Sequence, residues 1–168
     1  MISGAEEGVS LVEKARRMGN FRFILGIHAH QPVGNLSEVF AEAYRRSYVP
    51  FLDALSEYPR VPFALHYSGV LFDWLESSHP EFLDRLADFI TRGQVELLTG
   101  GYYEPILPAI PDVDKVGQIQ RMTSFLTSRF GVRPRGMWLA ERVWEPHLAK
   151  PIAEAGVEYV ILDDNHFK

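Results

Sequence analysis

Cysteine is absent from this 168-residue sequence, so its fold cannot depend on disulfides and its chemistry cannot use a thiolate. Basic residues are also scarce: 17 lysines and arginines stand against 22 acidic residues, which gives a net charge of −5. This balance disfavours a nucleic acid or an anionic membrane as a partner. We recognise no membrane-spanning apolar segment and no secretory leader, and we therefore expect a cytoplasmic protein.

The sequence is long enough to bury one globular core, because 46% of its residues are hydrophobic and only 23% are charged. It contains no low-complexity tract and no obvious internal repeat, so one domain is the simplest organisation. Residues 1–20 are polar, with a partly helical pattern, and we interpret them as an extension outside the core. The domain itself is then expected at residues 21–168.

Five short apolar segments alternate with segments of helical periodicity along the rest of the chain. We predict strands at 21–27, 61–65, 94–98, 136–140 and 157–162, and helices at 38–57, 70–92, 113–130 and 146–155. Asp112 is placed to cap the third helix, and Gly131 and Gly156 stand where helices are expected to end. The alternation predicts a parallel sheet with helical crossovers, in which the strands are apolar on both faces.

Residues capable of chemistry gather where these strands end. They are His28 and His30 at the first strand, His66 at the second, Glu96 and Glu104 in and after the third, Glu141 at the fourth, and Asp163, Asp164 and His166 at the fifth. In α/β barrels the carboxyl ends of the strands face the active site. We therefore predict an α/β fold, a parallel TIM-like (β/α) barrel that is incomplete because only about five strand–helix units are present.

Glu141 is the strongest single candidate for a catalytic carboxylate. It directly follows the apolar segment 136–140, and helix-compatible sequence begins at Pro146. A glutamate in this position is equally suited to capping a helix, so the residue alone leaves both roles open. The acids and histidines at the other strand ends favour catalysis.

Three separated motifs resemble glycoside hydrolase family 57. They are His-Ala-His-Gln-Pro at 28–32, Gly-Gln-Val-Glu-Leu-Leu at 93–98 and Trp-Leu-Ala-Glu-Arg-Val-Trp-Glu-Pro at 138–146, with residues 101–105 and 163–167 adding to the match. The similarity is greatest to the 4-α-glucanotransferases and α-amylases of that family, and it covers about residues 21–168. It implies the N-terminal part of an incomplete seven-stranded (β/α)7 barrel that acts on α-1,4-glucans with retention of configuration and requires no metal or other cofactor.

The resemblance also implies roles for individual residues. Glu141 would be the nucleophile that forms the glycosyl-enzyme, while His28, His30 and Glu96 would line the adjoining sugar subsite. Trp138 would serve as a packing or stacking platform. Such a set suits the reaction, because an oxocarbenium-like transition state needs a carboxylate on one face of the ring. Ordinary structural roles remain open for the histidines as hydrogen-bonded strand-end residues and for the tryptophan as a core residue.

One element of the family's chemistry is missing from the sequence. A retaining enzyme needs a second carboxylic acid about 5 Å from the nucleophile, and in this family that aspartate lies on a strand beyond Lys168. We therefore expect this polypeptide to be the N-terminal part of a longer enzyme and to be inactive alone. Its open sheet edge would also favour self-association.

Two other classes of function use part of the same evidence. A metal-dependent hydrolase could hold zinc with His28 and His30 together with Asp163, Asp164 and His166. A non-catalytic protein could bind maltooligosaccharide at the rim without turning it over. The family resemblance is favoured over both because all three motifs agree with it.

Overall fold

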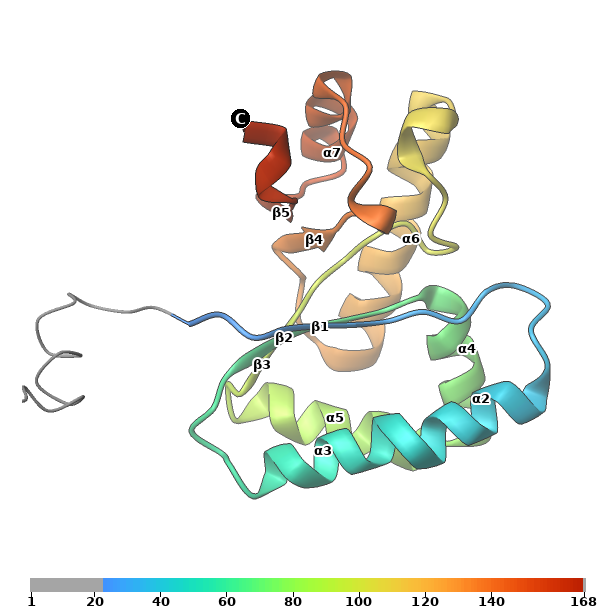
Figure 1. Ribbon diagram of the computed structural model, residues 1–168, viewed down its shortest axis with the longest axis vertical. Helices are drawn as coiled ribbons and strands as arrows, with labels where there is room; N and C mark the ends of the chain where they lie inside the picture. The colour runs from blue at the N-terminus through green and yellow to red at the C-terminus, as the bar shows by residue number, and fades with distance from the viewer. Residues whose placement is uncertain (1–22, 168) are drawn as a thin grey trace, which may run out of the picture.

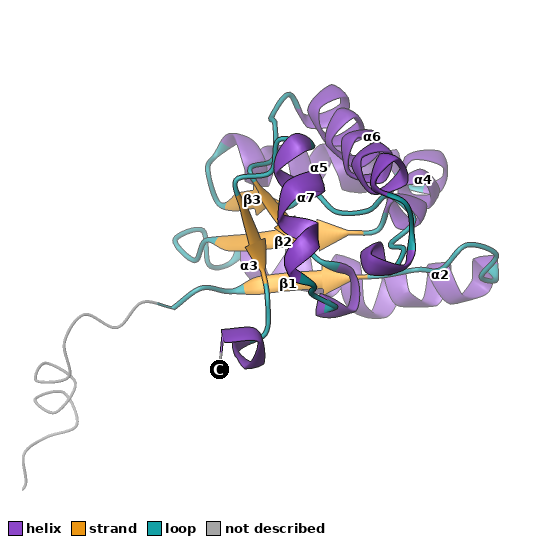
Figure 2. Cartoon of the chain, turned by 90° about the horizontal axis from the view of Figure 1, so that it is seen from above, coloured by secondary structure: helices purple, strands orange, loops and turns teal. Residues whose placement is uncertain are grey.

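The computed structural model describes residues 23–167, and the expected extension at residues 1–20 lies outside them. The described part contains short strands that are all paired in parallel. A three-stranded sheet is formed by β1 (Gly26–Ala29), β2 (Phe63–Tyr67) and β3 (Val95–Leu97), in that order, and β4 (Gly136–Trp138) pairs with β5 (Tyr159–Ile161). Figure 2 shows β1 and β2 running in the same direction.

A single parallel bridge joins the two sheets. Thr99, two residues after β3, donates its N–H to the carbonyl of Gly136 at 2.9 Å and accepts the N–H of Trp138 at the same distance. The strands therefore follow one another in chain order from β1 to β5. The prediction of an α/β fold with parallel strands is confirmed, and closure into a barrel stays a prediction.

Helices connect the strands as the periodicity predicts, with two corrections. The helices are α2 (Ser37–Ala43), α3 (Val49–Ser56), α4 (Gly69–Ser78), α5 (Pro80–Thr91), α6 (Asp112–Phe130) and α7 (Ala149–Glu154). A π-helical turn, Tyr44–Tyr48, joins α2 to α3, and the 3₁₀ turn Pro146–Leu148 leads into α7.

The helix predicted at 70–92 is two helices. The chain breaks at His79, whose φ of −144° and ψ of 56° are not helical, because the ring of Pro80 disfavours a helical conformation for the residue before it. The capping role predicted for Asp112 is also wrong. Pro111 occupies the cap, and Asp112 is the first helical residue and accepts a hydrogen bond from Lys115 Nζ at 2.6 Å. Gly131 ends α6 with a φ of 72°, as predicted.

The core lies between the sheet and its helices. In Figure 1, α2, α3 and α5 run along one face of β1–β3, while α6 and α7 lie beside β4 and β5. Leu65 and Tyr67 of β2 and Met137 of β4 are almost completely buried in the core between the strands and these helices. Successive residues of a strand point to opposite faces, so His66 and Trp138 project from the other face. The expectation of strands apolar on both faces is therefore wrong, because the second face carries polar and ring side chains.

Candidate active site

The pairing of β1 with β2 sets the first two histidines side by side. His28 is opposite His66 in the parallel register, and their Nδ1 atoms are 2.9 Å apart. Their strand neighbours Leu65 and Tyr67 are anchored in the core, which fixes the direction in which His66 projects. Each strand end thus contributes one imidazole to a shared position.

The loop after β3 brings a glutamate to the same place. Glu104 has a φ of 50°, in the left-handed region, and its N–H donates to the carbonyl of Gly101 at 2.9 Å in a tight turn. Gly100 makes room for the cluster, because a Cβ at this position would overlap His66 Nε2 and would lie 3.2 Å from the carbonyl oxygen of Trp138. The glycine before the turn is therefore needed for the approach of the ring.

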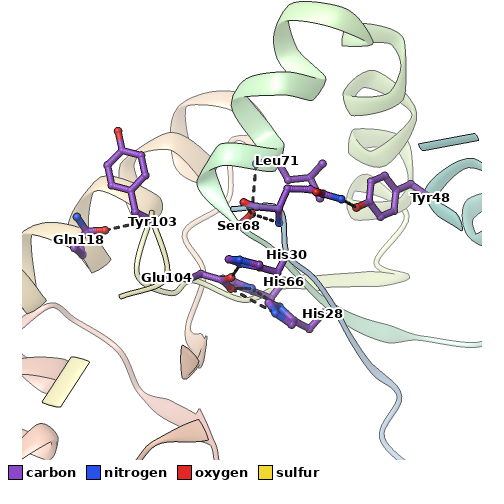
Figure 3. Close-up of polar contacts among 10 residues, drawn as sticks. His28, His30, Tyr48, His66, Ser68, Leu71, Tyr103, Glu104 and Gln118 are labelled. Atoms are coloured by element: carbon purple, nitrogen blue, oxygen red, sulfur yellow. Dashed lines mark hydrogen bonds and ion pairs between the residues drawn. The ribbon is translucent and has the colours of Figure 1, made fainter. Parts of the chain in front are cut away.

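Glu104 lies among three imidazoles, and we call His28, His30, His66 and Glu104 the histidine–glutamate cluster (Figure 3). One carboxylate oxygen, Oε2, contacts Nδ1 of His30. The other, Oε1, lies 3.3 Å from His66 Nδ1 and 3.6 Å from His28 Nε2. Within the described residues, Oε1 and His66 Nε2 are buried without a hydrogen-bond partner. Such unsatisfied groups are uncommon in native proteins and often mark functional positions.

Burial keeps two of these rings neutral. Removal from solvent lowers the pKa of His66 well below its usual value, and the neighbouring His28 and His30 lower it further. Burial, followed by the nearby His30 and Arg142, lowers the pKa of His28 to about 4. At neutral pH these imidazoles therefore act as hydrogen-bonding groups and not as cations.

Trp138 extends the cluster as an aromatic surface. Its ring stacks on His28 with centroids 4.6 Å apart and an angle of 13° between the planes. The guanidinium carbon of Arg142 lies 5.6 Å from the centre of the Trp138 ring. The predicted packing role is visible in the contact with His28, and the ring remains half-buried.

Glu141 occupies a strained turn directly after β4. Glu141 and Arg142 have φ values of 51° and 52°, in a region that costs a non-glycine residue about 1 kcal/mol or more. Arg142 holds the turn, because its Nε donates to Asp163 at 2.8 Å and its carbonyl lies 3.1 Å from His166 Nε2. The Glu141 side chain is exposed and caps no helix of the described chain. The capping alternative is therefore not realised.

Glu96 is not brought against the histidines. It pairs in register with Ala64, two residues before His66, which places it about 7 Å further down the strands. Its carboxylate accepts a hydrogen bond from the hydroxyl of Tyr159 at 2.7 Å. Burial, followed by this bond, raises the pKa of Tyr159 to about 12. The assignment of Glu96 to the sugar subsite stays a prediction.

The sequence pattern assigned no role to two members of the cluster. His66 was noted for its place at the end of a predicted strand, and Glu104 for its place after one and within the matching residues 101–105. Two signals pointed to them: both follow predicted strands, and Gly100–Gly101 immediately precedes the segment that carries Glu104. Adjacent glycines at a strand end often indicate that other groups approach the backbone closely.

The donor set of the alternative metal-dependent hydrolase is not assembled in the described residues. Asp163 and His166 contact Arg142 instead of the histidines of β1. In residues 23–167, the side chains with the spacing of a metal site are His28, His66 and Glu104, whose ligand atoms lie within 4.8 Å of one another. An imidazole–carboxylate set of this kind can in principle bind zinc, and it can equally form hydrogen bonds.

Comparison with known proteins places this geometry in context. The sequence model for glycosyl hydrolase family 57 matches residues 24–168. Alpha-amylase 1 of Dictyoglomus thermophilum is 54% identical over 145 residues, which are 86% of this chain and 21% of that protein. The 4-alpha-glucanotransferase of Thermococcus litoralis is 47% identical over 150 residues, 89% of this chain and 23% of that protein. The chain thus spans between a fifth and a quarter of the length of these relatives.

Solved structures agree with the sequence matches. The crystal structure of the Thermococcus litoralis 4-alpha-glucanotransferase superposes with a TM-score of 0.83 at 48% identity, covering 86% of this chain and 23% of that one. A family 4 carbohydrate esterase from Streptomyces lividans superposes with a TM-score of 0.59 at 16% identity. The match covers 83% of this chain and 62% of the esterase chain, and it shows a shared fold. None of the helices in residues 23–167 has the length and apolar character needed to cross a membrane.

Proposed function

The chain belongs to glycosyl hydrolase family 57, and on this basis we propose that it is part of a retaining enzyme that acts on α-1,4-glucans as a 4-α-glucanotransferase or an α-amylase. The names of its relatives support this substrate class. Because the chain spans only part of their length, the activity proposed is that of a longer protein.

The observation that carries the proposal is the meeting of sugar-binding chemistry at one end of the parallel strands. Four strand ends, those of β1, β2, β3 and β4, carry the groups concerned. They are the histidine–glutamate cluster, the half-buried ring of Trp138 and the exposed carboxylate of Glu141. Imidazole and carboxylate groups match sugar hydroxyls, and an indole matches the apolar face of a pyranose. The carboxyl ends of parallel strands are where such folds bind ligands.

Glu141 is proposed to act as the nucleophile. A carboxylate oxygen would bond to the anomeric carbon while the glycosidic bond breaks, and the departing oxygen would take a proton from a second carboxylic acid. Water or another sugar hydroxyl would then displace Glu141 and return the proton to that acid. Water gives hydrolysis, and the sugar gives transfer. The left-handed turn, held by the hydrogen bond from Arg142 to Asp163, would keep the Glu141 carboxylate at the ends of the strands and exposed to solvent.

The second carboxyl group is proposed to come from a later part of a (β/α)7 barrel to which this chain supplies five strands. Asp163, which lies near the turn, is already paired with Arg142. We therefore expect the 168-residue chain by itself to show no turnover of maltooligosaccharides. Turnover by this chain at rates typical of enzymes would contradict that expectation.

Rescue by azide tests the assignment of Glu141 in the longer protein. Glu141→Ala should lower kcat by several orders of magnitude with α-glucosyl fluoride, and azide should restore turnover by attacking the anomeric carbon from the vacated side. Carbon–nitrogen bond formation with loss of fluoride would yield the β-glucosyl azide. Glu145→Ala, which removes an exposed carboxylate four residues away, serves as the control and should retain activity.

The outcome also separates this proposal from its alternative. An α-configured azide product, or full activity of Glu141→Ala, would contradict the assigned nucleophile. Binding of maltooligosaccharide by the longer protein without any turnover would instead favour a non-catalytic glucan-binding protein.

A further inference from the structure

We propose that Glu104 is a positioning residue of the sugar site: its carboxylate accepts the Nδ1–H of His30 and so leaves Nε2 of that ring as a hydrogen-bond acceptor for a glucan hydroxyl. The identity of the ligand rests on the proposed function, whereas the Glu104–His30 pair rests on the geometry alone. The side chain of Glu104 is 5% exposed and that of His30 is 42% exposed. The carboxylate is thus the buried anchor, and the imidazole is the group that a ligand can reach.

The direction of each hydrogen bond follows from what the groups can donate. An ionised carboxylate only accepts, and a neutral imidazole has one N–H and one lone pair. With Glu104 ionised, the contact between its Oε2 and His30 Nδ1 places a proton of His30 on Nδ1. When the ring is neutral, the opposite nitrogen carries the lone pair. A carboxylate that fixes the tautomer of a histidine in this way also orients the ring.

The same rules assign the protons of the other two histidines, His28 and His66. His28 and His66 are neutral, so one proton lies between their Nδ1 atoms, which are 2.9 Å apart. If His66 donates that proton, His28 directs its Nε2–H at Glu104 Oε1 across 3.6 Å. If His28 donates it, two lone pairs face the carboxylate oxygen. The first arrangement is electrostatically favoured, because it turns N–H groups and not lone pairs toward the carboxylate.

A metal ion is the alternative occupant of the cluster. Ligand atoms about 2.0–2.1 Å from a tetrahedral zinc ion are separated by roughly 3.3 Å, and His66 Nδ1 and His28 Nε2 lie 3.3 and 3.6 Å from Glu104 Oε1. Zinc binding through Glu104 is therefore an outcome that the experiment must exclude.

Nitrogen NMR of the histidines tests the pair in the 168-residue chain. With ¹⁵N-labelled histidine at pH 7, the wild-type chain should show His30 protonated at Nδ1 and unprotonated at Nε2. Glu104→Ala should give the tautomer mixture of an unconstrained imidazole at His30. Glu104→Gln offers one acceptor and one donor, so at least one of the three histidines should exchange its tautomer. Glu145→Gln, at an exposed position, should change none of them.

Several results would overturn the proposal. They are an Nε2–H tautomer of His30 in the wild-type chain, unchanged tautomers in both Glu104 variants, or one equivalent of zinc bound through Glu104. The amide spectrum reports whether each variant is folded. If Glu104→Ala unfolds, Glu104→Gln decides, because it preserves the size of the side chain.

Titration of the longer protein and its Glu104 variants with maltotriose tests the link to the substrate. Loss of one oriented hydrogen bond should raise the Kd of the folded Glu104 variants about tenfold. An altered tautomer with an unchanged Kd would overturn the positioning role. If the longer wild-type protein does not bind maltotriose, the proposed function is contradicted, and the NMR result still decides whether Glu104 fixes the tautomer of His30.

Discussion

Replacing Gly100 with alanine tests how closely the backbone and the buried rings are fitted. Gly100 is buried, and a methyl group there would overlap His66 Nε2 and would lie 3.2 Å from the carbonyl oxygen of Trp138. The His66 side chain is fully buried, so it has no free space in which to rotate. Its ring lies against His28 and Glu104. The added atom must therefore displace either the ring or the backbone of β4.

The size of the effect follows from two opposing contributions. Overpacking a buried site costs about 1–3 kcal/mol. Alanine also restricts the unfolded chain relative to glycine, which stabilises the folded state by about 0.4–1 kcal/mol where the backbone angles permit. Gly100 has no left-handed φ, so this gain applies. We expect Gly100→Ala to lower the free energy of unfolding by about 1–2 kcal/mol.

Urea-induced unfolding measures this difference, and Gly117→Ala is its matched control. Gly117 lies in α6, and a Cβ there meets no atom within 4 Å. Alanine should therefore raise stability by up to about 1 kcal/mol through helix propensity alone. The two variants should shift the midpoint in opposite directions with an unchanged m-value. If Gly100→Ala were as stable as the wild-type chain, the close packing of His66 against the backbone would be refuted.

Three further measurements test other parts of the molecule. Because His28 has a pKa of about 4 in the folded chain and 6.5 as an ordinary histidine, its contribution to stability should be complete above pH 6.5 and should fall by about 1–3 kcal/mol as the pH drops through 4. A His28→Gln variant with the wild-type pH dependence of urea unfolding would refute this. Tyr102→Phe removes the 2.5 Å hydrogen bond from the Tyr102 hydroxyl to Asp73 and should lower the free energy of unfolding by about 1–2 kcal/mol. The control Tyr103→Phe, on an exposed ring, should leave stability unchanged, and equal melting temperatures of the two variants would count against the Tyr102–Asp73 bond. Finally, the edge strand β5, where Tyr159 is 40% exposed, should cause concentration-dependent self-association in analytical ultracentrifugation, and a monomer at every concentration would contradict that expectation.

The alternation of strands and helices could be predicted because it depends on local patterns. The helix predicted at 113–130 is observed at Asp112–Phe130, since its periodicity and its terminal glycine are both encoded within the segment. The break between α4 and α5 was also encoded locally, by Pro80, and was missed because apolar spacing continues across it. These errors concern the limits of elements and leave the fold class unchanged.

The candidate site was predictable only in part. Motif resemblance and strand-end position selected Glu141, His28 and His30 as candidates, and the structure places them at the ends of β4 and β1; their roles stay predictions. The same criteria grouped Glu96 with the histidines, whereas the register of β2 with β3 places Glu96 lower in the sheet, bonded to Tyr159. A shift of two residues along a strand preserves the face, so no local pattern could distinguish the two positions.

By itself the sequence determined the order of the elements, the parallel class of the sheet and the family to which the chain belongs, because periodicity and motifs are properties of neighbouring residues. The tertiary structure alone decided which side chains meet. Glu104 contacts a histidine 74 positions away, and His66 and His28 are 38 positions apart. Their contact depends on the strand register, on a left-handed turn and on the missing Cβ of Gly100, and these act together only after the chain has folded.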